Sequence, residues 1–538
     1  MDLISFSVSA PPSLVPLVEA AEGAFLETLR KIAPKDAGQG APLQVALQIN
    51  SPQCDLLIGL DESYTLSITS QPPSARITAE TFFGMRHALE TLSQLIIHDA
   101  PTRTLRIIST AHISDRPSFT YRGVLLDTSR QFYPLPFLHK LIEAMSYNKL
   151  NYFHWHISDT SSFSYESLAL PNVTKEGVFE GGMVYLQEEI QELVFYGKSR
   201  GVRVLPEFDA PSHAGNGWGW GEGAGLGNLA VCINQEPWTA YCIEPPCGQL
   251  NPVNPNIYDV LGKLYQEMYS VFGTPEMFHM GGDEVMVACW NSTQEIVNWM
   301  LEHNRNLTNI DYLNLWGQFQ QQAYAEFSKF TSTPPTAILW TSELVNHPNI
   351  MKNYINPSDY IIQVWENSET NTVPDLLNEG FRLITSNWDA WYMDCGVGGW
   401  VDSGSNWCSP YKEWQLMYSN KPYESLSGTW KITDPEQRKL LIGGESCLWS
   451  EEADAHSMEV RIWPRAAALA ERLWSDPSTS WREADDRMQY HRQRLVDRGI
   501  NADALQPLWC LYNQGKCTLP QSKRKIGAKA KPRDKSYL

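Results

Sequence analysis

The sequence lacks any continuous apolar run of the roughly 20 residues that a membrane-spanning helix needs, so no membrane span is predicted. Basic residues are scarce: 42 Lys and Arg stand against 61 Asp and Glu among 538 residues, and the formal net charge is −19. Nucleic acids and anionic membrane surfaces would repel such a chain, so we expect neither as a partner. Apolar residues make up 43 % and charged residues 19 %, which indicates a globular protein with a large core and excludes a disordered or fibrous chain.

Three motifs are also missing. The glycine-rich stretch 215–228 contains no G-x-x-x-x-G-K, so it is not a P-loop. The first 16 residues have neither a basic segment nor a continuous apolar segment, so no signal peptide is predicted in this sequence. The cysteines show no repeated C-x2-C spacing of the kind that zinc sites use.

The ten cysteines that are present favour disulfides. Six of them form three pairs at short range: Cys242 with Cys247, Cys395 with Cys408, and Cys510 with Cys517. Loops this short are typical of local disulfides. Three N-x-S/T sequons occur as well, at Asn172, Asn291 and Asn306. Both features predict a protein of the secretory route, either secreted to the extracellular space or lysosomal.

The pattern along the chain divides it into three parts. Residues 1–115 contain alternating strand-like stretches and one amphipathic helix over 79–97, which predicts a small α+β domain. Residues 116–510 form the main part. Residues 511–538 form a C-terminal segment whose basic tail, with seven Lys and Arg between Lys523 and Lys535, is expected to be solvated and disordered.

The main part alternates short apolar strands with amphipathic stretches. Eight strands are predicted, at 122–129, 151–159, 202–209, 277–284, 337–343, 360–366, 382–389 and 441–451. Continuous apolar strands that alternate with helices indicate a parallel sheet buried on both faces, and eight of them favour a (β/α)8 TIM barrel. Acidic and other polar residues gather at the ends of these strands, where a barrel of this kind carries its active site.

The motif HMGGDEV ends one of these strands with two consecutive acids, Asp283 and Glu284. In isolation such a pair is more often a helix N-cap, but here it stands at the predicted barrel mouth among other carboxylates. Glycosidases commonly use two carboxylates that straddle the sugar. Adjacent residues on one strand end cannot easily do so. If Glu284 is the acid, another group must attack the sugar.

The motif HWHISD places His154 and His156 on the same face of a strand. With Asp159 and His213 they could form the metal site of an amide hydrolase. The alternative is that the two histidines are buried, hydrogen-bonded core residues.

Tryptophan is unusually abundant, at 20 residues. Three stand at the ends of the fifth, sixth and eighth predicted strands, namely Trp340, Trp365 and Trp449, and Trp407 lies between Cys395 and Cys408. Strand ends of a barrel share one mouth, so these indoles could stack on the apolar faces of a sugar ring.

Taken together, these motifs resemble glycoside hydrolase family 20, the β-N-acetylhexosaminidases. The resemblance covers nearly the whole chain and rests on RGVLLDTSR, NYFHWHISD, PEFDAPSHAG, EPPCGQLNP, HMGGDEV, CWNS, DCG before a Trp-rich loop, GGE…LWSE and WPRAAALAERLW. EPPCGQLNP and NWCSPY are most similar to insect and other arthropod members that process chitin fragments. In this family the attacking group is the 2-acetamido oxygen of the substrate itself, an exception to the scheme with two carboxylates.

The resemblance implies a role for each candidate residue. Glu284 would be the general acid/base, Asp283 would orient the acetamido group, and Tyr392 would hydrogen-bond its oxygen. Asp159 and His213 resemble a relay behind Glu284. The groups that would bind the terminal sugar are Arg130, Glu451, Trp340, Trp365 and Trp449, and those that would bind the next sugar are Ile243, Glu244 and Trp407. No metal ion or other cofactor is implied.

We therefore predict an exo-acting β-N-acetylhexosaminidase that releases terminal β-linked GlcNAc, or GalNAc, from chitooligosaccharides with retention of configuration. The same chemistry on N-glycans or other glycoconjugates is the first alternative. A metal-dependent amide hydrolase and a non-catalytic sugar-binding protein are further alternatives. The expected partner is a small oligosaccharide, and a homodimer is left open.

Overall fold

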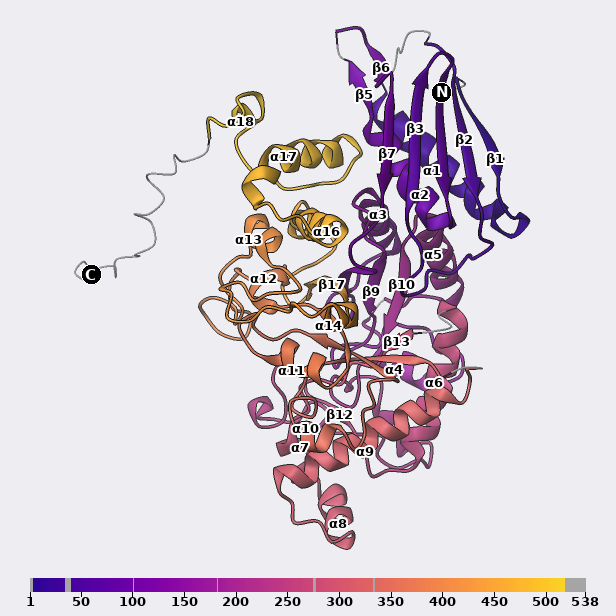
Figure 1. Ribbon diagram of the computed structural model, residues 1–538. Helices are drawn as coiled ribbons and strands as arrows, with labels where there is room; N and C mark the ends of the chain where they lie inside the picture. Colours follow the sequence, from indigo (N-terminus) through magenta and orange to yellow (C-terminus); the bar gives the residue numbers. More distant parts are fainter. Residues whose placement is uncertain are drawn as a thin grey trace, which may run out of the picture.

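The computed structural model describes residues 3–33, 40–99, 101–180, 182–273, 277–331 and 334–517. The predicted basic tail lies outside these residues. Figure 1 shows an elongated molecule with the N-terminal sheet at one end and the barrel below it. Among the described residues, no helix is both long and apolar enough to span a membrane.

The N-terminal part is a five-stranded mixed sheet covered by two helices. Its strand order is β1 (Ile4–Ser9), β2 (Leu43–Ile49), β4 (Pro73–Ala79), β3 (Tyr64–Ser70) and β7 (Ala111–Asp115). The helices are α1 (Val15–Ile32) and α2 (Phe82–Gln94), and the strands β5 (Ile96–Asp99) and β6 (Thr104–Ile107) form a separate hairpin. This is the α+β arrangement that the sequence predicts, with α2 inside the expected helix over 79–97.

The main part is a closed barrel of eight parallel strands. In chain order they are β8 (Tyr121–Asp127), β9 (Tyr152–His156), β10 (Arg203–Glu207), β13 (Met277–His279), β14 (Thr336–Trp340), β15 (Tyr360–Val364), β16 (Arg382–Thr385) and β17 (Leu441–Leu448). Each lies within or next to a predicted strand, so the (β/α)8 barrel is confirmed. Every residue of β8, β9, β15 and β17 is buried, which explains their continuous apolar character.

Helices surround the barrel, as the predicted alternation of apolar strands with amphipathic stretches requires. The longer ones are α3 (Leu135–Tyr147), α5 (Gln187–Ser199), α6 (Asn256–Phe272), α9 (Asn309–Ser328), α16 (Arg465–Ser475) and α17 (Trp481–Asp497). Shorter elements include α4 (Pro171–Gly177), α7 (Val287–Ser292), α8 (Gln294–Glu302), α11 (Thr372–Asn378), α12 (Trp388–Trp391), α13 (Trp414–Ser419), α14 (Pro435–Leu440), α15 (Met458–Ile462) and α18 (Leu508–Tyr512).

The N-terminal sheet and the barrel share buried residues. The first residues of the barrel strands, such as Tyr121 and Tyr152, belong to the same apolar cluster as the inner face of the N-terminal part. Across this boundary Nη2 of Arg122 lies 2.6 Å from Oε2 of Glu62, and both side chains are almost fully buried. The N-terminal part therefore closes the bottom of the barrel, and the carboxyl ends of the strands remain open at the other end. The division at residue 115 stays a prediction.

The three predicted disulfides are confirmed, at Cys242–Cys247, Cys395–Cys408 and Cys510–Cys517. A fourth joins Cys232 to Cys289. It was not predicted, because the two cysteines are 57 residues apart and only the fold brings them together.

Candidate active site

A pocket of about 570 Å³ lies at the carboxyl ends of the barrel strands. Predicted site residues line it as follows: Arg130, Asp159, His213, Ile243, Glu244, Asp283, Glu284, Trp365, Tyr392, Trp407, Trp449 and Glu451. Trp340 is the exception. It is only 1 % exposed and lies behind the lining, where its Nε1 donates to Oε1 of Glu207 at 2.7 Å and its ring packs 6.0 Å from that of Trp449.

The two acids follow β13 through a tight turn. Gly281 and Gly282 have φ values of +63° and +85°, a region that side chains rarely adopt. A Cβ on Gly281 would come within 1.8 Å of Oδ1 of Asp209, the same atom that accepts the Gly282 N–H at 2.8 Å. Glu284 itself has a φ of 49°. The turn therefore needs both glycines, and it aims Asp283 and Glu284 into the pocket.

Asp283 occupies an unusual environment for a carboxyl group. Its Oδ1 is buried without a hydrogen-bond partner in the described structure. Burial raises the pKa of Asp283 to about 6, with a further contribution from Glu284, while His213 opposes the rise. Burial and the neighbouring Asp283 likewise raise the pKa of Asp209 well above its ordinary value. A carboxyl group whose pKa is raised in this way is stabilised in its charged form when a positively charged group lies beside it.

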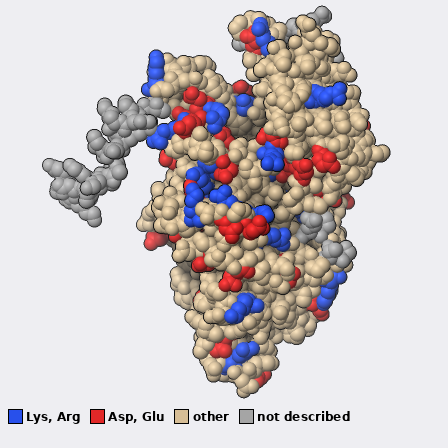
Figure 2. Space-filling view, in the orientation of Figure 1, with Lys and Arg blue, Asp and Glu red and all other residues tan. Residues whose placement is uncertain are grey.

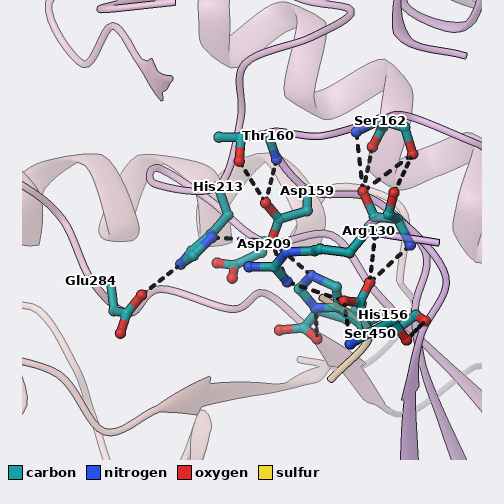
Figure 3. A network of polar contacts seen from close by, with 12 residues as sticks. Arg130, His156, Asp159, Thr160, Ser162, Asp209, His213, Glu284 and Ser450 are labelled. Carbon is teal, nitrogen blue, oxygen red and sulfur yellow. Dashed lines mark hydrogen bonds and ion pairs between the residues drawn. The ribbon is translucent and has the colours of Figure 1, made fainter. Parts of the chain in front are cut away.

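His213 connects Glu284 to the interior (Figure 3). Its Nε2 lies 3.4 Å from Oε2 of Glu284, and its Nδ1 lies 3.0 Å from Oδ2 of Asp159. Burial alone would lower the pKa of His213, but Asp159 and, less strongly, Asp209 raise it well above its ordinary value. The ring is therefore an imidazolium that contacts one carboxyl group on each side.

This contact continues through the barrel as alternating carboxylates and imidazoles. Oδ2 of Asp159 lies 3.1 Å from Nε2 of His156, whose Nδ1 lies 2.5 Å from Oε2 of Glu207. The same Glu207 oxygen lies 3.1 Å from Nε2 of His154, and Nδ1 of His154 lies 2.9 Å from Oε1 of Glu445. All five residues of this chain are buried. Both histidines are therefore buried and paired with carboxylates, as the core alternative predicts, and His156 also reaches the lining of the pocket.

Arg130 is the other charged centre of the pocket. Its Nη1 lies 2.8 Å from Oδ2 of Asp159 and its Nη2 lies 2.8 Å from Oε1 of Glu244. Its Nε lies 3.9 Å from Oε1 of Glu451, and its guanidinium lies over the ring of Trp449 at 5.5 Å. Burial raises the pKa of Glu451 well above its ordinary value although Arg130 opposes this. A guanidinium and a carboxyl group side by side can bind adjacent sugar hydroxyls.

The aromatic lining runs from buried to exposed. Tyr392 is 3 % exposed, whereas Trp407 is 63 % and Ile243 is 54 % exposed. The ring of Trp407 lies 6.2 Å from those of Tyr392 and Trp365. Burial raises the pKa of Tyr392 well above its ordinary value, so its phenol stays a hydrogen-bond donor.

Several lining residues were not among the predicted site residues. They include Trp238, Trp400, Asp209 and Asp394. Trp400 lies in the same disulfide loop as Trp407, and Trp238 stands four residues before Cys242. The Cys395–Cys408 loop was an available signal, because it presents Trp400 as well as Trp407 to the pocket, whereas Trp238 lies outside the Cys242–Cys247 loop.

The fold and the pocket define the class of the protein. Carboxyl groups at the ends of parallel strands face indole and phenol rings across a pocket of the size that holds small ligands. This combination suits acid-assisted cleavage of a glycosidic bond, and the protein is a glycoside hydrolase of the (β/α)8 class.

Comparisons with known proteins give the particular family. The model of the glycosyl hydrolase family 20 catalytic domain matches residues 119–477, and the model described as beta-acetyl hexosaminidase like matches residues 16–95. The chain belongs to glycosyl hydrolase family 20, as its motifs predict.

Insect relatives and a bacterial structure extend this likeness. The chain is 45 % identical to the chitooligosaccharidolytic beta-N-acetylglucosaminidase of Ostrinia furnacalis, over 93 % of this chain and 83 % of that protein. It is 43 % identical to the protein of the same name from Bombyx mori, over 96 % of this chain and 85 % of that protein. The crystal structure of Flavobacterium johnsoniae chitobiase superposes with a TM-score of 0.73 at 25 % identity, covering 92 % of this chain and 70 % of that one.

Proposed function

We propose that this enzyme removes single terminal β-linked N-acetylhexosamine residues from the non-reducing end of chitooligosaccharides. The observation that carries the proposal is the gradient of exposure along the pocket. Arg130 and Tyr392 are nearly buried at its inner end, while Trp407 and Ile243 are exposed at its outer end. A sugar chain can enter such a pocket only by its end, so cleavage is exo. The two insect relatives are named for action on chitooligosaccharides, which supports this choice of substrate.

The adjacency of Asp283 and Glu284 favours participation of the substrate. Glu284 gives its proton to the glycosidic oxygen as the bond from that oxygen to C1 breaks. The acetamido oxygen forms a new bond to C1, and a cyclic oxazolinium ion results. Asp283 accepts the acetamido N–H and stabilises the cation, and Tyr392 donates a hydrogen bond to the acetamido oxygen. Glu284 then takes a proton from water, the water oxygen attacks C1, and the bond from C1 to the acetamido oxygen breaks. This restores the acetamido group and retains the configuration.

His213 and Asp159 position the acid in this scheme. The imidazolium of His213 lies between the carboxyl groups of Glu284 and Asp159, and it stabilises Glu284 after the proton has left. Arg130 and Glu451 hold hydroxyl groups of the terminal sugar, and the rings of Trp365 and Trp449 surround it. We keep Trp340 as a support of this wall, because it packs behind Trp449.

Beyond the cleaved bond, Trp407, Ile243 and Glu244 offer a flat indole, an aliphatic side chain and a carboxylate to the next sugar. A linear GlcNAc chain suits this surface, because the faces of successive sugars are apolar and unbranched. A branched N-glycan would meet the loop that carries Trp400 and Trp407.

The decisive experiment compares initial rates on chitotetraose and on a GlcNAc-terminated biantennary N-glycan. We expect a kcat/KM ratio in favour of chitotetraose, and we expect Trp407→Ala to reduce that ratio while it leaves turnover of an aryl β-GlcNAc glycoside nearly unchanged. Equal rates on both glycans, and an equal effect of Trp407→Ala on them, would contradict the chitooligosaccharide assignment.

We also propose that the enzyme works in an oxidising compartment as a glycoprotein. Four disulfides support this, and the asparagines of all three sequons are exposed. The Asn291 side chain accepts a hydrogen bond from Tyr312, so Asn172 and Asn306 are the better acceptors of a glycan. Removal of N-glycans with a peptide N-glycosidase should lower the mass of the secreted protein.

A further inference from the structure

A second cavity, of about 480 Å³, lies at the other end of the barrel from the active site. It is enclosed by α16, α17 and the residues that follow α3, and it lies where α17 faces the N-terminal part; Figure 2 shows the notch between these two parts of the molecule. We call it the basic pocket. The residues of its lining that matter here are Lys149, Glu471, Trp474, Arg487, His491 and Arg494.

One face of α17 supplies the positive charge. Arg487, His491, Arg494 and Arg498 follow one another at spacings of four, three and four residues, so they lie on the same side of the helix. The first three line the basic pocket. Arg498 is 1 % exposed behind them, where its Nη1 lies 2.7 Å from Oε1 of Glu90.

The hydrogen bonds of His491 show that this ring is neutral. The Asn148 amide nitrogen donates to the Ala144 carbonyl, so Asn148 Oδ1 is an acceptor, and it lies 2.7 Å from Nε2 of His491. Nε2 must therefore carry the proton, which leaves Nδ1 to accept from Nη1 of Arg494 at 2.8 Å. Burial lowers the pKa of His491 to about 3, with Arg494 and Arg498 adding to the effect.

The acids near the pocket are already engaged. Glu471 lies 2.6 Å from Nη2 of Arg487 and accepts the hydroxyl of Tyr418. Asp115 pairs with Lys149 at 3.2 Å. Glu90 pairs with Arg498, and Asp497 accepts a hydrogen bond from the side-chain amide of Gln493.

Arg494 is left without a carboxylate partner: no described residue places a carboxylate oxygen within 4.0 Å of its guanidinium. Burial lowers the pKa of Arg494 and Arg498 lowers it further, while the more distant carboxylates of Glu90 and Asp497 offset only part of this effect. A guanidinium that is half-buried beside other cations is unfavourable unless an anion compensates it.

We propose that the basic pocket binds a small tetrahedral oxyanion, with Arg494 as the principal contact and Arg487 and Lys149 as supporting cations. Guanidinium groups present paired N–H donors that match phosphate and sulfate oxygens, and the pocket is large enough to admit such an ion with its water. The site is independent of the glycosidase reaction, because it lies at the amino-terminal end of the barrel.

Calorimetric titration of the full chain with inorganic phosphate and with sodium sulfate, at pH 7 and constant ionic strength, tests the proposal. We expect saturable binding at one site for both ions, and none for chloride. Arg494→Gln should weaken binding by about tenfold or more, since hydrogen bonds to charged groups are strong. The control is Arg482→Gln, which removes the same charge from an exposed position of α17 outside the pocket and should leave the affinity within about twofold.

Turnover of an aryl β-GlcNAc glycoside checks that each variant is folded, and it should be unchanged in both. If Arg494→Gln is inactive, Arg487→Gln is the replacement, and it should also weaken binding by about tenfold or more, because it removes one cation and frees the Glu471 carboxylate to repel the ion. Absence of saturable binding up to about 20 mM of either ion would overturn the proposal, as would equal affinity in the wild type and in Arg494→Gln.

Discussion

The Nε2 atom of His213 lies 3.4 Å from Oε2 of Glu284, and both residues adopt left-handed backbone conformations, with φ values of 55° and 49°. Non-glycine residues rarely adopt this region, and where they do the surrounding structure enforces it. Two separate loops, after β10 and after β13, are therefore held in strained forms that bring an imidazolium and a carboxyl group together. The Glu284 side chain is still 27 % exposed. His213 therefore contacts it from the interior of the barrel while the carboxyl group remains open to the pocket.

Replacement of Glu284 by Gln should remove the proton donor and leave the shape of the pocket intact. We expect kcat to fall by about 10²–10⁴-fold on chitooligosaccharides. The loss should be smaller on aryl glycosides whose leaving groups need no protonation. Glu222→Gln, at an exposed position outside the pocket, is the control. A loss that is the same for all leaving-group pKa values would show that Glu284 is not the acid.

Asp283→Asn should abolish activity on substrates with an acetamido group and at the same time stabilise the fold. Burial raises the pKa of Asp283 to about 6, above the value of about 3.8 expected in the unfolded chain, so the folded state binds the extra proton between these values. Stability is therefore lost as the pH rises from about 4 to 6, and the full cost of about 1–3 kcal/mol remains at higher pH. Asparagine removes this cost.

Thermal unfolding at pH 5 and at pH 8 measures this effect. The melting temperature of Asp283→Asn should exceed that of the wild type more at pH 8 than at pH 5. A lower melting temperature at pH 8 would contradict the burial argument.

Asp209 should shift the acidic limb of the pH profile of kcat/KM through its effect on the pKa of Asp283. A hydrogen bond from Asp209 lowers the pKa of Asp283, so the loss of this bond in Asp209→Ala should raise that pKa and move the acidic limb of kcat/KM to higher pH. Asp209→Asn can still donate to Asp283 and accept the Gly282 N–H, so its limb should move less. If the acidic limb lies at the same pH in both variants, a group other than Asp283 determines it.

The strand pattern and the strand-end rule predicted most of this site from the sequence. Eight apolar strands define a barrel, and a barrel brings its strand ends together, so Asp283, Glu284 and Trp449 could be assigned to one mouth from the sequence alone. The position of Trp340 could not be predicted in the same way. It is also at a strand end, but its indole turns inward to Glu207, and periodicity says nothing about the depth of a side chain in the barrel.

Long-range pairing was the other limit. The partner of Cys232 lies 57 residues away, and the carboxylates that fix His154 come from other strands, with Glu445 lying 291 residues along the chain. Local spacing left His154 and His156 open between a metal site and the core. The closed barrel places Glu207 between them, and the pairing and burial of both rings could be seen only there.

The contact between Glu62 and Arg122 should be essential for attachment of the N-terminal part to the barrel. Glu62→Gln would leave the buried guanidinium uncompensated, at a cost of about 3–5 kcal/mol in the free energy of unfolding. Burial would raise the pKa of Glu62, but Arg122 and His87 lower it to about 2. The stabilisation is therefore complete above about pH 4.5 and is lost as the pH falls towards 2.

Urea unfolding of Glu62→Gln and of the exposed control Glu19→Gln measures this difference. Activity per folded molecule should be unchanged in both variants. Equal midpoints for the two would mean that the contact contributes nothing to stability.

Removal of the Cys395–Cys408 disulfide should weaken binding of oligosaccharides more than it affects catalysis. The loop it closes carries Trp400 and Trp407 to the outer end of the pocket, and the side chain of Asn406 still ties it to the Gly396 N–H and the Asp394 carbonyl. The double variant Cys395→Ala/Cys408→Ala must therefore order a loosened loop on binding, and we expect KM for chitotetraose to rise by about tenfold. KM for an aryl β-GlcNAc glycoside, which ends before Trp407, should change little.

Removal of the Cys510–Cys517 disulfide, whose cysteines are not part of the pocket lining, is the control and should leave both constants unchanged. A parallel rise in both KM values would mean that the disulfide supports the inner pocket instead of the outer one.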